Sequence, residues 1–310
     1  MLKASNISFA YADKTVIDNI SFSIGKGKQV AVIGESGCGK STLLKLLYGL
    51  HDLDEGLISW DENPVLGPKF NLIPGHDAMK YLAQDFGLMP FITVAENVGN
   101  FLSNVYKDKK SERIAELLAM VEMTEFADIK AQFLSGGQQQ RTALAKVLAL
   151  EPEVLLLDEP FSQIDTFRAN TLRRKLFKYF RENGITCIMA THDSVDVLSF
   201  SDETLVMKDG KIVAAGQSKT IYENPGTRYV ATLFGDVNEI PAAMLRAENK
   251  FVYPHQLAVV KQSNFSVTVI NSWFKGDSHR IEALSQFGKI YFDHPTALPK
   301  TAMVCLALKK

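Results

Sequence analysis

The sequence contains one glycine-rich string, G-E-S-G-C-G-K-S-T, between Gly34 and Thr42. It follows the short apolar run 29–33, which predicts a strand, and precedes a leucine-rich stretch that predicts a helix over 41–50. In such a loop, backbone N–H groups turn inward around phosphate oxygens, Lys40 places a charge at the β- and γ-phosphates, and Ser41 is able to ligate Mg²⁺. The start of the helix adds the positive end of its dipole. The candidate phosphate-binding residues are Gly34, Glu35, Ser36, Gly37, Cys38, Gly39, Lys40, Ser41 and Thr42.

A second string, V-L-L-L-D-E at 154–159, predicts a buried strand that delivers two adjacent carboxylates at its carboxyl end. Neighbouring residues on a strand point in opposite directions. Asp158 can therefore hold the shell of a Mg²⁺ ion while Glu159 faces the attacking water. Taken alone, such a pair is more often a solvated strand end, but the phosphate loop in the same chain favours the catalytic interpretation.

A third string, L-S-G-G-Q at 134–138, lies just before a predicted helix over 137–150. Ser135 is a good N-cap, and the glycines expose N–H groups at a helix start, so the string predicts a second anion-binding device. The plainer alternative is an ordinary Ser-Gly cap. One phosphate loop already binds one nucleotide, so a second device indicates a nucleotide shared between two chains. Its candidate residues are Ser135, Gly136, Gly137 and Gln138.

Composition narrows the class of protein. The 310 residues are 46% hydrophobic and 22% charged, close to average globular usage, which excludes disordered and disulfide-scaffold classes. A net charge of -1 provides no field for holding a polyanion, so no nucleic-acid partner is expected. No apolar run approaches the ~18 residues of a spanning helix and no signal peptide is evident, so we expect any membrane role to come through a partner.

The three cysteines are too few and too far apart for a disulfide framework or a four-ligand zinc site, and they are typical of a reducing compartment. We therefore expect a cytosolic chain. Cys38 lies inside the phosphate loop, at a helix start and beside Lys40, an environment expected to lower a thiol pKa. We interpret it as a bystander that could still react.

The periodicity of the first 236 residues alternates helices with buried strands, which predicts a parallel sheet with helices on both faces. Strands are predicted at 3–9, 20–24, 29–33, 154–157, 185–190, 203–208 and 211–215. Further helices are predicted at 93–102, 111–121 and 166–182.

After Asp236 the pattern changes to short strands separated by polar turns, which predicts a small antiparallel domain over 239–310 beside a domain over 1–236. Its strands are predicted at 259–260, 266–271, 279–284, 289–292 and 304–308, with one helix at 241–249. A domain of this size has a marginal core. We expect it to lean on the first domain or on a second subunit.

Together these motifs resemble the ATPase family of ABC transporters over residues 1 to about 235. The resemblance rests on Tyr11, the Gly34 to Ser41 loop, Gln84, L-S-G-G-Q, V-L-L-L-D-E, S-Q-I-D at 162–165 and T-H-D at 191–193, in the family's order. It implies an α/β P-loop fold of the ABC ATPase type followed by a small C-terminal β-rich, OB-like domain.

The resemblance also implies a role for each matching residue. Tyr11 would stack on adenine, Gln84 would reach Mg²⁺ and the attacking water, Glu159 would be the general base, and His192 would contact the γ-phosphate. Asp165 would lie at a dimer seam, while Ser135, Gly136 and Gln138 would meet the γ-phosphate bound by the opposite subunit. Gln163-Ile164 departs mildly from the small residue and leucine usual there.

The kind of ATPase follows from the spacing and the tail. Related chromosome-maintenance ATPases place long coiled coils between the phosphate loop and L-S-G-G-Q, whereas only about 50 residues separate Gln84 from Ser135. The apolar segment 87–98 resembles the surface on which transporter ATPases seat a helix of the membrane subunit, although it could equally be an amphipathic core helix.

The tail resembles the regulatory (TOBE-like) domain of importers for iron(III), polyamines, sulfate or molybdate. Tyr253 stands where arginine is usual.

The sequence thus predicts the ATP-hydrolysing subunit of an importer, with ATP and Mg²⁺ as cofactors. Its expected partners are a second copy or a related ATPase subunit, permease subunits and a solute-binding protein, at the cytoplasmic face of the membrane. One alternative is a soluble ABC-type ATPase acting on nucleic acid or ribosomes, which the near-zero charge and single ATPase domain disfavour. Another is a regulatory module without turnover, which Glu159 and His192 disfavour.

Overall fold

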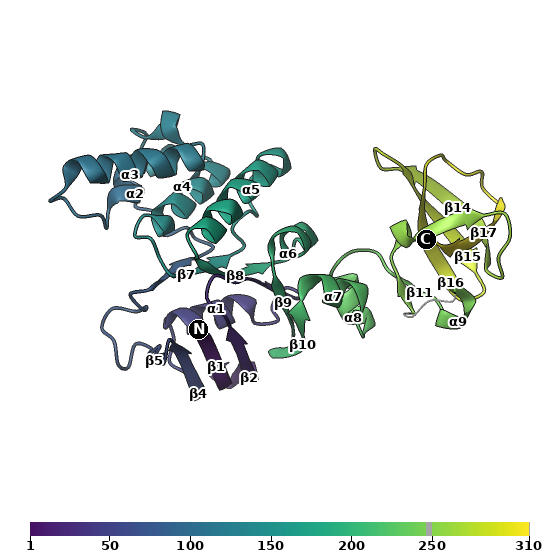
Figure 1. Cartoon of the computed structure of the whole chain (residues 1–310), viewed down its shortest axis with the longest axis horizontal. Coiled ribbons are helices and arrows are strands. Elements are labelled where there is room, and N and C mark those ends of the chain that lie inside the picture. Colours follow the sequence, from purple (N-terminus) through teal and green to yellow (C-terminus); the bar gives the residue numbers. More distant parts are fainter. Residues whose placement is uncertain (246–249, 310) are drawn as a thin grey trace. The chain divides into compact units, whose positions relative to one another are not determined.

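The computed structural model describes residues 1–245 and 250–309 and divides into two compact units, Met1–Ser218 and Lys219–Lys310 (Figure 1). The first unit is built around a six-stranded sheet in the order β10-β9-β3-β8-β7-β6. All neighbouring strands of this sheet run parallel except β10, which is antiparallel to β9. The strands are β3 (Gln29–Ile33), β6 (Met79–Leu82), β7 (Val154–Asp158), β8 (Thr186–Thr191), β9 (Glu203–Lys208) and β10 (Lys211–Gln217).

The strand directions determine where the motifs meet. The carboxyl ends of parallel strands lie at one edge of a sheet, and ligands of such folds bind outside that edge. The loops after β3, β7 and β8 begin at Gly34, Glu159 and His192. The fold therefore gathers the phosphate loop, the carboxylates and the histidine segment at the same edge.

A second, antiparallel sheet covers one face of the first, with the strand order β2-β1-β4-β5. Its strands are β1 (Leu2–Tyr11), β2 (Lys14–Ile24), β4 (Glu55–Trp60) and β5 (Asn63–Pro64). Between the two sheets lies α1 (Lys40–Tyr48), whose Leu43 and Leu47 are fully buried in a core shared with Ile58. Helix α1 thus covers this face of the parallel sheet, as predicted, whereas the sequence did not predict the strands β4 and β5 that lie beyond it.

Helices cover the other face, as predicted (Figure 1). Their core includes the buried aromatic side chains of Phe177 and Phe180 together with Leu155 of β7. These helices are α2 (Val94–Gly99), α3 (Lys107–Met120), α4 (Gly136–Leu148) and α5 (Thr166–Glu182), with α6 (Ser194–Phe200) following β8 and the short turns η1 (Thr124–Phe126) and η2 (Ala131–Phe133). Helix α5 has the predicted bounds, whereas α2 is shorter than predicted and α3 begins four residues earlier.

The second unit is β-rich. Its main sheet has the order β13-β17-β14-β15-β16, and its edge strands β13 and β16 contact each other, as in a small partly open barrel. The strands are β13 (Leu257–Val260), β14 (Ser266–Phe274), β15 (His279–Ser285), β16 (Gly288–His294) and β17 (Met303–Leu308), preceded by the pair β11 (Asn238–Glu239) and β12 (Phe251–Val252). The other elements are α7 (Ser218–Glu223), α8 (Arg228–Thr232), α9 (Ala242–Leu245) and η3 (Pro254–Gln256). Of the helix expected at 241–249, residues 246–249 lie outside the described residues.

The division between the units lies about 20 residues before the expected boundary at Asp236. Aromatic packing explains the difference. Tyr222 of α7 stacks on Tyr253 with ring centroids 4.4 Å apart, and the Tyr253 hydroxyl donates a hydrogen bond to the Ala231 carbonyl at 3.3 Å. Asp236 itself pairs with Arg280 of β15. Helices α7 and α8 therefore group with the β-rich tail. Within the described residues, no helix is both long and apolar enough to cross a membrane.

Candidate functional site

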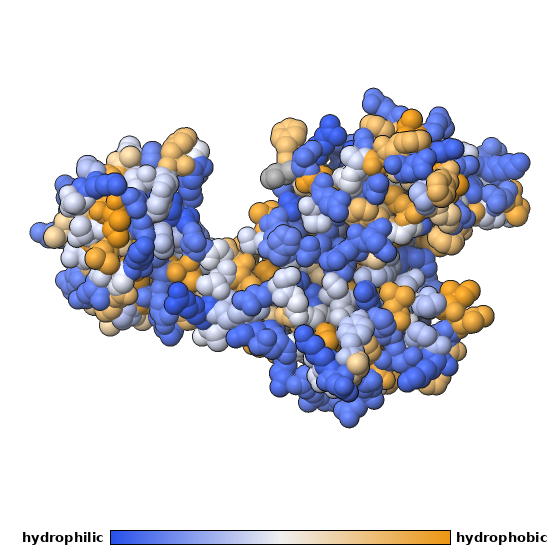
Figure 2. All heavy atoms as spheres, turned by 180° about the vertical axis from the view of Figure 1, so that it is seen from behind, coloured by the Kyte–Doolittle hydropathy of each residue, from blue (hydrophilic) through white to orange (hydrophobic). Residues whose placement is uncertain are grey.

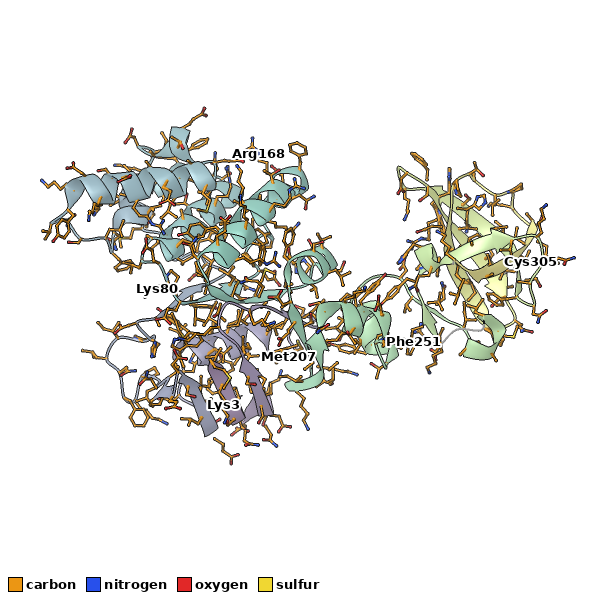
Figure 3. All side chains as sticks on the ribbon, in the orientation of Figure 1. Lys3, Lys80, Arg168, Met207, Phe251 and Cys305 are labelled. Atoms are coloured by element: carbon orange, nitrogen blue, oxygen red, sulfur yellow. The ribbon has the colours of Figure 1, made fainter. Side chains whose placement is uncertain are left out.

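The phosphate loop closes tightly against the central sheet. The Lys40 ammonium, largely buried, donates hydrogen bonds from Nζ to the carbonyls of Gly34 at 2.8 Å and Glu35 at 2.9 Å. A Cβ on Gly34 would lie 2.3 Å from the carbonyl oxygen of Met207 in the neighbouring strand β9 (Figure 3), so only glycine fits there.

The shape of this loop fits a polyphosphate. Glu35, Ser36 and Gly37 form its exposed rim, while Cys38 and Gly39 are buried and α1 begins at Lys40. The loop thus joins the positive end of a helix dipole to a fixed ammonium group. Ser41 and Thr42 lie in the first turn of α1.

The structure corrects the expectation for Cys38. Its Sγ lies 4.0 Å from Lys40 Nζ, yet burial raises the pKa of the thiol and outweighs the lowering effect of the lysine charge. Desolvation disfavours the thiolate. The expectation of a lowered thiol pKa is therefore wrong.

The residues proposed for Mg²⁺ lie together. Ser41 Oγ donates to Asp158 Oδ1 at 3.0 Å, and the hydroxyl of Tyr81 donates to Asp158 Oδ2 at 3.3 Å. Burial raises the pKa of Asp158, and the charge of Glu159 adds to this effect, while the hydrogen bonds from Ser41 and Tyr81 oppose it.

A hydroxyl and a carboxylate are hard oxygen donors of the kind Mg²⁺ prefers, and Mg²⁺ usually takes its remaining ligands from phosphates and water. Accordingly, no group of three or more His, Cys, Asp or Glu side chains able to hold a metal occurs in the described part of the chain. The Ser41 and Asp158 pair therefore fits Mg²⁺ that arrives with a nucleotide.

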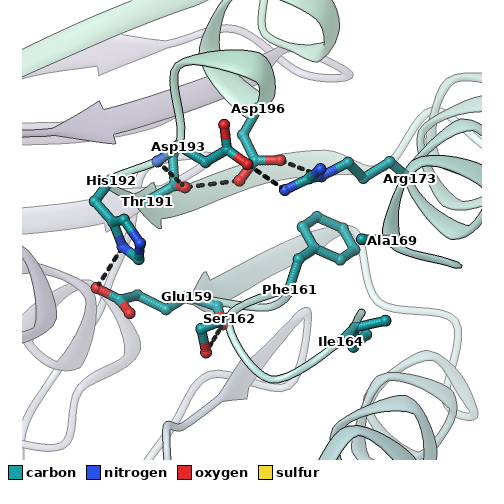
Figure 4. A pocket seen from close by; sticks show the side chains of 10 residues that line it. All are labelled: Glu159, Phe161, Ser162, Ile164, Ala169, Arg173, Thr191, His192, Asp193 and Asp196. Carbon is teal, nitrogen blue, oxygen red and sulfur yellow. Dashed lines mark hydrogen bonds and ion pairs between the residues drawn. The ribbon is translucent and has the colours of Figure 1, made fainter. Parts of the chain in front are cut away.

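Glu159 faces away from Asp158, toward the end of β8. Its Oε1 lies 3.3 Å from Nδ1 of His192, beside a cavity of about 180 Å³ (Figure 4). The Glu159 backbone is held in the left-handed region, at φ 50°, by a hydrogen bond from its N–H to the Ala190 carbonyl at 2.9 Å. A strained non-glycine residue of this kind typically marks a functional position.

Gln84 lies in the first turn beyond β6 and is exposed. Strand β6 pairs with β7, with Leu82 opposite Leu157, so Gln84 shares the edge that carries Asp158. Among the described residues, however, its side chain makes no hydrogen bond. The structure instead connects Asp158 to Tyr81, which lies three residues before Gln84. The sequence analysis missed this tyrosine.

Tyr11 lies at the end of β1 with 43% of its surface exposed. Its hydroxyl is 3.0 Å from Nε2 of His51, and its ring packs edge-on against Phe9. Burial is the main reason that the pKa of His51 is lowered. The tyrosine ring is thus fixed in orientation by its neighbours.

The L-S-G-G-Q string forms a capping box at the start of α4. The Gln138 N–H donates to Ser135 Oγ at 3.4 Å, and the Ser135 N–H donates to Gln138 Oε1 at 2.8 Å. A Cβ on Gly137 would lie 2.7 Å from the carbonyl oxygen of Gln163. The string opens onto a separate cavity of about 410 Å³, lined by Ser135, Gly136, Gly137, Gln138, Arg141, Gln163, Ile164, Asp165 and Arg168.

Two further residues contact the segments that carry Glu159, Gln163 and His192. Gln140, almost fully buried, donates from Nε2 to the Glu159 carbonyl at 2.9 Å and accepts from the Gln163 N–H at 3.0 Å. It lies on the buried face of α4 with Leu144 and Leu148, so a polar residue within an apolar stripe was the available sequence signal. The other missed residue is Arg173 of α5, which pairs with Asp193 at 2.6 Å beside His192.

The fold and the phosphate loop define a P-loop nucleotide-binding protein. A sequence profile of the family described as "ABC transporter" matches residues 17–162. The chain is 38% identical over 239 residues to the Fe(3+) ions import ATP-binding protein FbpC of Escherichia coli O157:H7. The aligned region covers 76% of this chain and 68% of that protein. The chain belongs to the ABC transporter family, among the ATP-binding subunits of import systems. Such subunits hydrolyse ATP.

Other comparisons agree. The spermidine/putrescine import ATP-binding protein PotA of Marinobacter nauticus is 35% identical over 249 residues, covering 80% of this chain and 66% of PotA, so the chain spans about two thirds of the length of such relatives. A dimeric structure of the ATP-binding cassette MJ0796 bound to ADP and Pi aligns with a TM-score of 0.63 at 28% identity, over 70% of this chain and all but 1% of that one. The structure of cbiO1 from Clostridium perfringens aligns with a TM-score of 0.63 at 29% identity, over 72% and 91% of the two chains.

Proposed function

We propose that this protein is the ATP-hydrolysing subunit of an importer and that hydrolysis depends on Glu159. The observation that carries the proposal is the division of labour between adjacent carboxylates. Asp158 faces Ser41 at 3.0 Å, whereas Glu159 faces His192 at 3.3 Å on the other side of the strand end. A base at Glu159 is thereby kept apart from the carboxylate that serves the metal.

In the proposed reaction, Lys40 and the loop N–H groups bind the β- and γ-phosphates, and Tyr11 offers its ring to adenine. Mg²⁺, when bound with the nucleotide near Ser41 and Asp158, neutralises charge on the phosphates. Glu159 accepts a proton from the attacking water, which Gln84 helps to orient. His192 contacts the γ-phosphate and lies against the Glu159 carboxylate.

The second anion-binding device supports a head-to-tail dimer. The cavity at Ser135 is distinct from the cavity at Glu159, which supports the proposal that one chain carries two different parts of a nucleotide site. MJ0796, which is similar to this chain, has been solved as a dimer. We propose that Ser135, Gly136, Gly137 and Gln138 complete the site of the opposite subunit and that Asp165 lies at the seam.

The apolar surface of the first unit supports a membrane partner. Met89, Phe91, Phe101, Val105 and Tyr106 are all exposed. The face in Figure 2 is mostly hydrophilic, with its apolar residues in separate groups. We propose that permease subunits bind the segment 87–106, that the chain works at the cytoplasmic face of the membrane, and that a solute-binding protein delivers the cargo.

Glu159→Gln tests the catalytic proposal. The amide keeps the size of the side chain but cannot accept the proton, so turnover should fall by roughly 10² to 10⁴ while ATP still binds. Hydrolysis, nucleotide affinity and nucleotide-dependent dimer mass are measured together. Near-normal hydrolysis in this variant would exclude Glu159 as the base.

Mixed dimers test the shared site. Lys40→Ala should weaken nucleotide binding by its own subunit, whereas Ser135→Arg should spare binding but block the closed dimer. Pairing the two variants concentrates both defects in one of the two sites and leaves the other intact. If the mixed dimer hydrolyses no ATP, the shared-site proposal is wrong.

A further inference from the structure

A buried arginine links the two segments that carry Glu159 and His192. Arg173 lies in the middle of α5 and is only 5% exposed. Its guanidinium pairs with two carboxylates of the segment after β8, from Nη2 to Asp193 Oδ2 at 2.6 Å and from Nε to Asp196 Oδ1 at 2.5 Å (Figure 4). Asp196 is itself 2% exposed.

These carboxylates hold the chain on both sides of His192. Thr191 Oγ1 donates to Asp196 Oδ2 at 2.7 Å and accepts from the Asp193 N–H at 3.0 Å. Asp193 Oδ1 accepts from the Val195 N–H at 2.8 Å and so caps α6. The residues before and after His192 therefore belong to one hydrogen-bonded network, and Arg173 joins that network to α5 through a hydrogen bond to Asp193 and an ion pair with Asp196.

The same guanidinium contacts the Glu159 segment. Its central carbon lies 5.0 Å from the centroid of the Phe161 ring, within the range of a cation–π interaction. Phe161 is buried and lies two residues after Glu159. One side chain thus packs against both segments whose reactive groups lie 3.3 Å apart.

Stability alone does not account for this arrangement. A buried ion pair commonly gives no more stability than apolar side chains of similar volume, because removing charges from water is costly. An arginine, however, holds carboxylates in fixed directions through its planar fork. Burial raises the pKa of Asp196, while Thr191 and the charge of Arg173 oppose this effect.

We propose that Arg173 is a positioning residue for ATP hydrolysis, which fixes the His192 segment relative to the Glu159 segment through Asp193, Asp196 and Phe161. It touches no substrate and acts only through these neighbours. The inference rests on the proposed roles of Glu159 and His192. Because misplacing a catalytic group by about 1 Å costs about 10²-fold in rate, its effect should fall on turnover and not on nucleotide binding.

The test compares Arg173→Met and Arg173→Lys with Arg174→Met and Arg174→Lys in the full-length chain. Arg174 is the neighbouring residue on α5, but it is exposed, so it controls for the loss of an arginine from this helix. We expect kcat to fall about 10²-fold in Arg173→Met and less in Arg173→Lys, which keeps the charge but loses the fork. Dissociation constants for Mg-ATP should stay within about twofold, and the Arg174 variants should match the wild type.

Two reference variants separate this inference from the proposed function. If Glu159→Gln and His192→Ala both turn over normally, the proposed function fails first. If they are inactive while Arg173→Met keeps wild-type kcat, only the positioning role is overturned. If Arg173→Met fails to fold, Asp193→Asn replaces it, since this nearly isosteric change removes one charge of the pair but keeps an oxygen for the α6 cap. An unchanged kcat in Asp193→Asn, or a Kd that rises in step with the loss of kcat, would then refute the proposal.

Discussion

Replacing Gln140 with leucine should weaken both the fold and the catalytic site. The side chain is almost fully buried and makes two hydrogen bonds to backbone groups, one to the Glu159 carbonyl at 2.9 Å and one from the Gln163 N–H at 3.0 Å. Leucine has a similar size, so the change removes the polar contacts with little change in volume. Both backbone groups would then lack this partner.

The magnitude follows from those two groups. A buried polar group left without a partner costs about 1 to 3 kcal/mol. The hydroxyl and the backbone N–H of Ser162 also donate to the Glu159 carbonyl, at 3.1 and 3.3 Å, so that oxygen keeps two partners and its share lies at the low end. We therefore expect the free energy of unfolding of the first unit to fall by about 2 to 4 kcal/mol. Glu159 should also lose part of the support for its strained backbone, which should lower kcat.

Urea denaturation followed by circular dichroism measures the first effect, and steady-state hydrolysis measures the second. Gln132→Leu is the matched control, because Gln132 is exposed and its side chain makes no hydrogen bond within the described part of the chain. If Gln140→Leu shifts the urea midpoint no more than Gln132→Leu does, with the same slope, the two hydrogen bonds do not stabilise the first unit.

Three further outcomes are expected. Because burial raises the pKa of Asp158, keeping this carboxyl ionised lowers the stability of the folded chain, and this loss grows as the pH rises above the usual carboxylate range. Asp158→Asn should therefore raise the Tm of the nucleotide-free chain at pH 7, and the gain should shrink toward acid pH. A lowered Tm in calorimetry would contradict this. Iodoacetamide should label the partly exposed Cys305 before the buried Cys38, so faster labelling of Cys38 by mass spectrometry would restore the low-pKa view. A chain ending at Ser218 should melt more cooperatively than one ending at Asp236, because the longer one keeps Tyr222 without Tyr253; equal melting curves would favour the later boundary.

Much of the fold could be predicted from local patterns. The buried strand Gln29–Ile33 and the helix Thr166–Glu182 have the predicted bounds, because an unbroken apolar run and a 3.6-residue period are each sufficient signals. The strand Glu55–Trp60 was missed because only Ile58 and Trp60 are buried in it, and it is recognised by its pairing with β1. The compact units divide at Ser218, before the expected Asp236, and the stacking of Tyr222 on Tyr253, which joins residues about 30 positions apart, accounts for this difference.

The sequence by itself determined the chemistry of the site. The spacing of glycines, Lys40 and Ser41, and the adjacent carboxylates Asp158 and Glu159, are local arrangements, so each motif carries its geometry within a few residues. Only the tertiary structure decided which motifs meet. The 3.3 Å approach of Glu159 to His192 depends on β7 and β8 pairing in parallel, and the burial that raises the pKa of Cys38 depends on packing against distant strands. The same holds for Arg173, because a charged residue on an amphipathic helix gives no local sign of the carboxylates that it will face.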